Sequence, residues 1–484
     1  MRPRLEPLTR DELDTIHGAT LRVLETVGIR VLDPEAAGLL HDAGASVDAS
    51  SGLVRASESL IREWTSAAPR RFKLYGRNPK HVLSFGEGNT YLSPVGTAVG
   101  VEDLEGDFRP AVLEDVERFH RLADALPHLD HASWAVWPRD VPEESAHAYL
   151  MLSGFRNATK PVDGYNLGRE RTRQTIEMAA IVAGGRDALV ERPLLLGFAN
   201  PVSPLMLNRE TTEGLIEYAR HGQPTTIPPE CMSGGTSPAT LAGLLVQQNA
   251  EILLSVAIAQ LARRGAPVLY GSASTIMDMR TGGVALGAPE AGLVMVATAQ
   301  LARYYGIPSR GTGGNTEAIT PDYQAGAETT STLLLAALAG FDFIYDAAGS
   351  IESSLSAGYV KLLLDHEMCG EVRRILSGID VNDETLAVDA IRAVGPGRAF
   401  LGHPHTLRHF RTEHYSPRLF HRSPRSALAR GEKSVWGKAR ARCEEILAEH
   451  VVDPPLDPDV EARLVDYVKG VCARYSVAAP HLSV

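Results

Sequence analysis

The segment that decides the fold begins with PVLYG at 267–271, continues with IPSRGT at 307–312 and ends with DFIYD at 342–346. Longer amphipathic stretches at 289–305 and 323–340 separate these short apolar runs. Strands that alternate with helices of this length predict parallel βαβ units with right-handed crossovers. The segment therefore predicts an α/β fold built on a parallel sheet.

The same alternation continues toward the N-terminus. Four more short runs predict strands: HASWAVW at 131–137, PVDGY at 161–165, PLLLGF at 193–198 and PTTIP at 224–228. Stretches 209–221 and 238–264 predict two more helices. Seven or eight such units in succession favour a closed (β/α)8 TIM barrel over an open sheet. The eighth strand is expected either at 398–402 or before residue 131.

The flanks of the barrel have different patterns. Thr9, with Glu12 three residues later, predicts a capping box that opens a helix over 9–28. Short apolar runs broken by Gly and Asn over 71–114 predict small antiparallel strands. We expect three parts, which are an N-terminal helical and β-hairpin addition (1–114), a barrel domain (115–402) and a helical tail packed on the barrel (403–484).

The composition argues against a nucleic-acid-binding protein, a disulfide-bonded secreted protein and a membrane protein. The chain has 484 residues, a formal net charge of -11 and no large basic region, which argues against nucleic acid as a partner. The four cysteines are widely spaced and form no CxxC pair, so a reduced, cytoplasmic compartment is expected. Charged residues interrupt every long apolar run, and the N-terminus lacks the apolar core of a signal peptide, so no membrane segment is expected.

Candidate site residues follow from the barrel prediction, because the residues after each strand gather at one mouth, where chemistry takes place. They mix aromatic, amide and charged side chains without a nucleophile and base in obvious association, so no catalytic residue is assigned. The candidates that follow the strands are Trp137, Tyr165, Phe198, Asn200, Glu230, Tyr270, Arg310, Tyr345 and Asp346.

Long and unusual motifs occupy the second half of the chain. One reads ECMSGGTSPATLAGLL from residue 230, another reads LARYYGIPSRGTGGNTEAITPDYQAGAE over 301–328, and a third reads FLGHPHTLRHFRTEHYSPRLFHR over 400–422. These motifs resemble the trimethylamine methyltransferase family, and the resemblance extends over nearly the whole chain. It implies a TIM-barrel enzyme that passes a methyl group to the corrinoid cofactor (a cobalamin) of a separate partner protein.

The resemblance also implies two branches. One branch carries pyrrolysine and acts on trimethylamine, and the other lacks pyrrolysine and includes glycine betaine methyltransferases. Ile319 stands where related sequences have pyrrolysine or lysine. The chain therefore resembles the second branch, and a small quaternary amine is the expected substrate.

The chemistry of a quaternary amine agrees with the candidate residues. Its nitrogen donates no strong hydrogen bond, so aromatic faces and nearby carboxylates are the groups suited to hold it. Its leaving group is a neutral tertiary amine, which needs no general acid. If the amine is a betaine, its carboxylate needs donors, and Arg310, Asn200 or Asn315 can supply them.

A histidine cluster raises the question of a metal. His405 and His409 are four residues apart and on a helix would lie on one face. Because no HExxH pattern is present and the resemblance implies no metal, we expect a structural segment and no tightly bound metal.

Two other functions remain open: a catalytically silent homologue that binds a betaine, and a methyltransferase for an unrelated methylated amine. We also expect a homo-oligomer, although no stretch of sequence specifies the number of subunits.

Overall fold

A computed structural model describes residues 4–426 and 431–482. Its centre is a curled sheet of seven parallel strands in the order β6-β18-β17-β14-β12-β10-β9. Six of these strands fall where the sequence predicts them. In chain order the strands are β6 (Tyr91–Pro94), β9 (Val162–Asp163), β10 (Leu195–Phe198), β12 (Thr225–Ile227), β14 (Val268–Gly271), β17 (Ser309–Thr312) and β18 (Phe343–Ala348).

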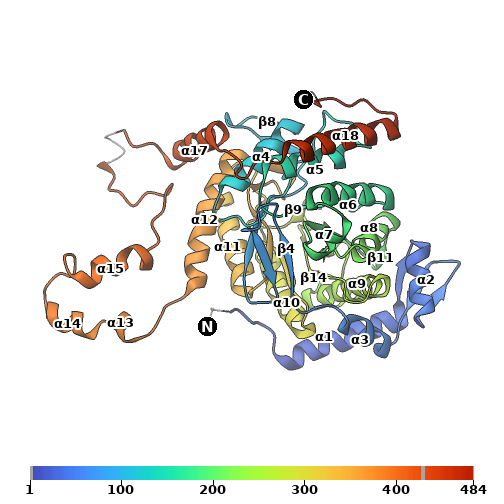
Figure 1. The fold of residues 1–484 in the computed structure, drawn as a ribbon. Helices are drawn as coiled ribbons and strands as arrows, with labels where there is room; N and C mark the ends of the chain where they lie inside the picture. The colour runs from blue at the N-terminus through green and yellow to red at the C-terminus, as the bar shows by residue number, and fades with distance from the viewer. Residues whose placement is uncertain (1–3, 427–430, 483–484) are drawn as a thin grey trace.

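The seventh strand, β6, corrects two expectations. It lies inside the segment expected to form only antiparallel strands, yet it pairs in parallel with β18, with Tyr91 opposite Phe343. The sheet therefore begins upstream of residue 115. Residues 398–402, the other expected place for a strand, are exposed and form none. They cannot join the sheet because they lie on an arm that projects from the body (Figure 1).

The predicted strand at 131–137 is not regular. It makes two isolated parallel bridges, Ala132 with Val162 and Ala98 with Val136. Ala135 has φ 55°, in the left-handed region, so the backbone cannot continue an extended ladder through it. The segment nevertheless lies between β6 and β9.

Helices surround this sheet (Figure 1). They are α4 (Leu113–Ala125), α5 (Ala146–Asn157), α6 (Arg169–Ala183), α7 (Arg186–Glu191), α8 (Arg209–Arg220), α9 (Leu241–Ala262), α10 (Pro289–Tyr305), α11 (Tyr323–Ala339) and α12 (Tyr359–Ser377). Between β9 and β18 each strand is followed by at least one helix that leads to the next strand, as βαβ units require, and α12 follows the last strand.

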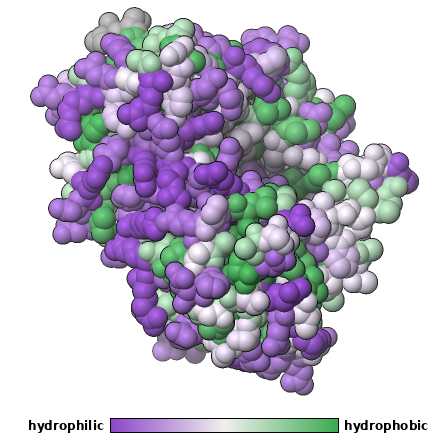
Figure 2. Space-filling view, turned by 90° about the vertical axis from the view of Figure 1, so that its right-hand side faces the viewer, coloured by the Kyte–Doolittle hydropathy of each residue, from purple (hydrophilic) through white to green (hydrophobic). Residues whose placement is uncertain are grey.

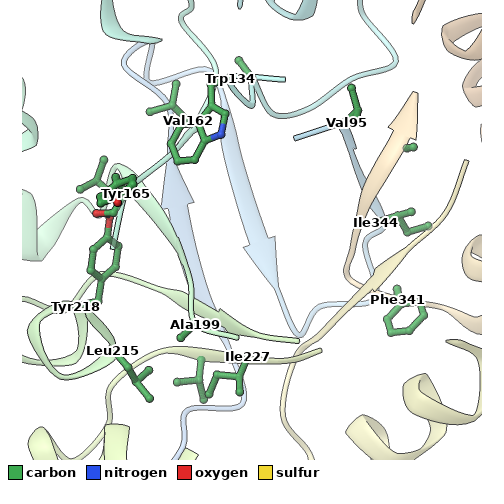
Figure 3. Close-up of a cluster of buried hydrophobic side chains, with 14 of the residues drawn as sticks. Val95, Trp134, Val162, Tyr165, Ala199, Leu215, Tyr218, Ile227, Phe341 and Ile344 are labelled. Atoms are coloured by element: carbon green, nitrogen blue, oxygen red, sulfur yellow. The ribbon is translucent and has the colours of Figure 1, made fainter. Parts of the chain in front are cut away.

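The core joins the strands to these helices. Every residue of β18 is buried, as expected for a parallel strand covered on both faces. Figure 3 shows apolar side chains gathered around the curled sheet, from Val162 through Ile227 to Ile344. This packing fixes the strand ends that carry the candidate residues.

Helix α9 is apolar on all sides. By length and composition it could cross a membrane, but 78% of its apolar window is buried inside the protein. It packs against α1, α3 and α8, which explains why no polar face is needed. On the face drawn in Figure 2, hydrophobic side chains form separate patches among hydrophilic ones.

The N-terminal part packs against α9. The expected capping box forms at Thr9 and Glu12, and a π-helical turn follows the first helix. Its helices are α1 (Arg10–Arg22), η1 (Val23–Val27), α2 (Pro34–Asp42) and α3 (Glu58–Ser66). The associated short strands are β1 (Ile29–Val31), β2 (Ser46–Asp48), β3 (Leu53–Arg55) and β11 (Met206–Leu207).

Short strands also flank the curled sheet. One hairpin is β4 (Phe72–Tyr75) with β5 (Val82–Phe85), the antiparallel pair that the sequence predicts. The others are β7 (Gly100–Glu102), β8 (Phe108–Pro110), β13 (Met232–Ser233), β15 (Thr275–Met277), β16 (Val284–Ala285), β19 (Ser350–Ile351) and β20 (Ser356–Gly358).

The C-terminal part divides into an arm and a covering pair of helices (Figure 1). The arm carries α13 (Asp383–Leu386), α14 (Val388–Val394) and α15 (Pro404–Glu413) and projects from the body. Helices α17 (Val435–Glu449) and α18 (Pro458–Tyr475) return to it, with α17 against α12 and α18 against α5 and α6.

Candidate active site

A cavity of about 1240 Å³ lies at the carboxyl ends of the parallel strands. This is the mouth at which barrel proteins carry their active sites. The structure brings eight of the ten candidate residues to its wall. They are Trp137, Tyr165, Phe198, Asn200, Glu230, Arg310, Tyr345 and Asp346.

Tyr270 is not brought to this wall. Side chains along a strand alternate between its two faces, and Leu269 faces the inside of the curled sheet in a cluster with Phe343 and Tyr345. Tyr270 therefore faces the surrounding helices. Its hydroxyl donates a 2.8 Å hydrogen bond to Asn249 Oδ1 on α9.

Asn315 lies behind the cavity wall. Its Nδ2 donates to Ser354 Oγ at 3.2 Å and contacts Asp346 Oδ2 at 3.5 Å. It can thus orient Asp346 without touching a molecule in the cavity. The nearby Ile319 is 66% exposed and does not line the cavity, whereas Glu317 from the same loop does.

Arg310 is the buried cation of the site. Its guanidinium lies between two aromatic rings, 5.1 Å from the Phe198 centroid and 5.0 Å from the Tyr345 centroid. Nη1 donates to the Ser272 carbonyl at 2.9 Å, and Nε has no hydrogen-bond partner among the described residues. Burial lowers the pKa of Arg310, and the carboxylate of Asp346 opposes that effect.

Asp163 is the main residue that the candidate set missed. It lies on β9 and accepts a 2.7 Å hydrogen bond from the Tyr345 hydroxyl. Burial raises its pKa to about 7. A signal was present in the sequence, because an aspartate inside the apolar run PVDGY has no reason to be there for packing.

Two more carboxyl groups face the cavity. Glu230 accepts a 2.6 Å hydrogen bond from Asn200 Nδ2, and burial raises its pKa. Asp346 accepts from the Gly96 backbone N–H at 3.3 Å, and burial raises its pKa to about 6. Asp346 also has φ 58°, and a non-glycine residue held in this region is typical of a functional site.

An aromatic pair lies apart from Arg310. The rings of Trp137 and Tyr165 have centroids 6.0 Å apart, and both residues line the cavity. Trp137 Nε1 donates to Glu143, and the Tyr165 hydroxyl accepts from Arg171, so the polar ends of both rings are satisfied. Trp134, which the candidate set also missed, lines the same cavity.

Acidic residues outnumber basic residues in the cavity wall. Two arginines line it, Arg139 and Arg310. The acidic lining residues are Glu143, Asp163, Glu210, Glu230, Glu317, Asp346 and Glu352. A wall with this excess of carboxyl groups and with aromatic faces favours a cationic ligand.

Comparisons with known proteins agree over almost the full length. A family model described as trimethylamine methyltransferase matches residues 1–473. The glycine betaine methyltransferase of Desulfitobacterium hafniense (strain Y51) is 35% identical over 96% of this chain and 97% of its own. A trimethylamine methyltransferase of Desulfitobacterium hafniense (strain DSM 10664 / DCB-2) is 37% identical over 97% of this chain and 94% of its own.

Solved structures support the fold alone. The monomethylamine methyltransferase of Methanosarcina barkeri superposes with a TM-score of 0.51 at 11% sequence identity. The match covers 90% of this chain and 92% of that one. The arrangement of strands and helices is therefore shared with a methyltransferase of known structure.

Proposed function

This chain belongs to the trimethylamine methyltransferase family and is a methyltransferase, and from that premise we propose that its methyl donor is a betaine, with glycine betaine the first candidate. The proposed acceptor is the cobalt of a corrinoid on a separate partner protein. One observation carries the choice of donor: an acidic, aromatic-lined cavity contains a single deeply buried arginine.

The ammonium end fits the acidic and aromatic part of the wall. The faces of Phe198 and Tyr345 are already occupied by the Arg310 guanidinium, which leaves Trp137 and Tyr165 for a second cation. A desolvated cation–π contact contributes about 2 kcal/mol. We therefore assign the trimethylammonium group to the Trp137–Tyr165 pair.

The carboxylate end fits Arg310. Arg310 is 1% exposed, and its Nε has no hydrogen-bond acceptor among the described residues. A buried donor without an acceptor destabilises the protein, and a ligand that accepts from Nε would remove this cost. The carboxylates of Asp346 and Glu230 favour the charged form of Arg310 and oppose the lowering of its pKa by burial. A ligand carboxylate at Arg310 would add a charge-assisted hydrogen bond.

The proposed reaction is an in-line displacement. The bond between nitrogen and one methyl carbon breaks as the bond from that carbon to the acceptor forms, and nitrogen keeps the electron pair. The product is a neutral tertiary amine, so no side chain has to supply a proton. The residues of the cavity bind the donor, orient one methyl group toward the mouth and exclude water.

The loop at Ile319 agrees with a donor that is already charged. In the branch of the family that acts on trimethylamine, an electrophile stands at the matching position. Here the side chain is apolar, exposed and outside the cavity wall. A quaternary amine needs no such activation, whereas a neutral methylamine does.

The mouth fits a partner that carries a corrinoid. The cavity wall includes four apolar side chains that stay exposed, those of Val99, Leu167, Val284 and Leu355. Exposed apolar groups around a cavity mark a surface that another molecule covers. These residues would contact the partner, and the cofactor would supply a nucleophilic cobalt to accept the methyl group.

The proposal also covers the eighth strand of the barrel, the oligomeric state and the location of the protein. We propose that residues 132–136 act as the eighth barrel strand between β6 and β9, supported by their two parallel bridges. We propose a homo-oligomer, because large apolar side chains of the arm are exposed; these are Ile379, Val381, Leu386, Leu401 and Leu407. A cytoplasmic location is supported by four free, buried cysteines.

A ligand panel tests the donor. Glycine betaine, its isostere with an uncharged tert-butyl group in place of the trimethylammonium, tetramethylammonium and trimethylamine are titrated by calorimetry, and methyl transfer to cob(I)alamin is then followed by absorbance. Betaine is expected to bind more tightly than the other three and to be demethylated. Equal demethylation of trimethylamine would contradict the proposed donor, and betaine binding without transfer would identify a silent homologue.

The variant Arg310→Lys tests the two-ended binding mode. Lysine keeps the charge but loses the planar guanidinium, so betaine affinity should fall by about tenfold or more. The affinity for tetramethylammonium, which has no carboxylate, should change little. A similar loss for both ligands would contradict a carboxylate at Arg310.

A further inference from the structure

The projecting arm, residues 379–426, has almost no core of its own. The structure buries no residue of α13 or α15, and in α14 it buries only Ala390 and Val394. Segments this small are usually stabilised by a disulfide, a structural metal or contact with another subunit, because they cannot bury enough apolar surface alone. No cysteine lies between Cys369 and Cys443, so a disulfide cannot supply it.

One polar cluster joins two helices of this arm. His405 and His409 lie one turn apart on α15, with ring centroids 4.4 Å apart. Nε2 of His405 lies 3.2 Å from the Glu384 carbonyl oxygen, and Nε2 of His409 lies 3.0 Å from Glu384 Oε1. Both imidazoles therefore point the same nitrogen toward one residue of α13.

We propose that Glu384, His405 and His409 bind a zinc ion that ties α13 to α15. One ligand atom from each residue lies within 4.8 Å of the others. Two imidazoles and one carboxylate bind zinc in known catalytic sites, where water completes the tetrahedron, so this donor set is suited to zinc. Zinc–nitrogen bonds are about 2.0–2.1 Å long, so partly exposed side chains need only small rotations to close on the ion.

The surroundings support a ligand role for the carboxylate. Arg408 Nη2 donates to Glu384 Oε1 at 3.0 Å. Carboxylates that ligate a metal usually accept a hydrogen bond from an outer partner, which fixes their orientation. His403 instead caps α15, because its Nδ1 accepts a hydrogen bond from the His405 backbone N–H at the start of that helix.

The site goes beyond the proposed function. None of the three ligands lines the cavity at the strand ends, so zinc would fix the shape of the arm and take no part in methyl transfer. The inference also revises the expectation of no bound metal, which depended on the missing HExxH pattern and on a resemblance that implies no metal. The third ligand comes from α13, 21 residues before His405.

Metal binding by the full-length protein tests the proposal. The protein is stripped with a chelator, dialysed and titrated with zinc chloride. The wild type should bind one equivalent, and His409→Ala and Glu384→Gln should bind at least about 100-fold more weakly, because even outer-partner changes cost roughly 10–100-fold. His414→Ala, a histidine of the same arm outside the cluster, is the matched control and should bind as the wild type does.

Cobalt(II) substitution supplies an independent readout. A tetrahedral site with two imidazoles gives strong visible absorption, which the His414→Ala protein should retain and the His409→Ala protein should lose. Zinc should also slow proteolysis within 379–426 in the wild type and in His414→Ala, but not in His409→Ala. Absence of stoichiometric zinc binding in wild-type protein, or unchanged binding in both ligand variants, would overturn the proposal.

Discussion

The Tyr345 hydroxyl on β18 donates a 2.7 Å hydrogen bond to Oδ2 of Asp163 on β9. These strands are separated in the sheet by four others, so the bond spans the interior of the curled sheet. Asp163 also lies 3.6 Å from Nε2 of His131, whose pKa burial lowers to about 3. The aspartate therefore depends on Tyr345 for its direct hydrogen bond and on a more distant Arg310 for charge.

Tyr345→Phe should destabilise the protein, most strongly above pH 7. A hydrogen bond to a charged acceptor contributes about 1.5–3 kcal/mol, and Asp163 is ionised only above its raised pKa of about 7. Denaturant unfolding at pH 8 and pH 5 measures the difference. Tyr218→Phe is the control, because its hydroxyl contacts the Tyr165 carbonyl at 3.5 Å and should cost less. Equal losses at both pH values would contradict an ionised acceptor.

Stability should fall as pH rises from about 4 to about 7. Burial raises the pKa of Asp163 from 3.8 to about 7, so the folded protein holds a proton that the unfolded chain has released in this window. Above the folded-state pKa, the contribution of this proton to the free energy of unfolding is fully lost. Asp163→Asn cannot ionise, and the variant should show a flatter profile of unfolding free energy against pH. A profile of unchanged slope would place the titrating group elsewhere.

Affinity for a quaternary ammonium should increase with pH across the same range. An ionised carboxylate attracts the cation, and burial raises the pKa of Asp346 to about 6. At pH 5 most of this group is neutral, so binding should be about tenfold weaker than at pH 8. Calorimetry with tetramethylammonium measures this, and Asp346→Asn should remove most of the dependence. The tert-butyl isostere of betaine, a carboxylate without the cation, is the ligand control and should not gain affinity as the pH rises.

Gly96→Ala should disturb the site through Tyr345. A Cβ at this position would lie 2.0 Å from the Tyr345 hydroxyl oxygen, which is already hydrogen-bonded to Asp163. Overpacking of this kind costs about 1–3 kcal/mol and should also weaken betaine binding. Gly38→Ala in α2, where a Cβ meets nothing within 4 Å, is the control. Unchanged stability and binding in Gly96→Ala would show that the tyrosine ring can shift freely.

Tyr270→Phe should affect stability and leave ligand binding unchanged. The variant loses the 2.8 Å hydrogen bond to Asn249, which is worth about 1 kcal/mol. Because the side chain faces the helices, betaine affinity should stay within about twofold of the wild type. Trp137→Ala should show the reverse, with a cation–π loss of about 2 kcal/mol in binding. A strong loss of affinity in Tyr270→Phe would place this ring at the ligand.

The sequence by itself determined the alternation of strands and helices. Short β-rich runs and long amphipathic stretches are local patterns, so β10, β12, β14, β17 and β18 and their helices could be located from them. The capping box at Thr9 and Glu12 is local in the same way. Residues that follow a strand could therefore be expected at the mouth, and eight of ten line its cavity.

Only the tertiary structure decided which side of a strand each residue faces and which distant segments meet. Tyr270 faces outward because its strand alternates from Leu269, a register that depends on pairing with both neighbouring strands. β6 joins the sheet through β18, about 250 residues later, and no local pattern records that pairing. Asp163 and Glu384 were likewise missed, because their partners Tyr345 and His409 are brought to them by long-range packing.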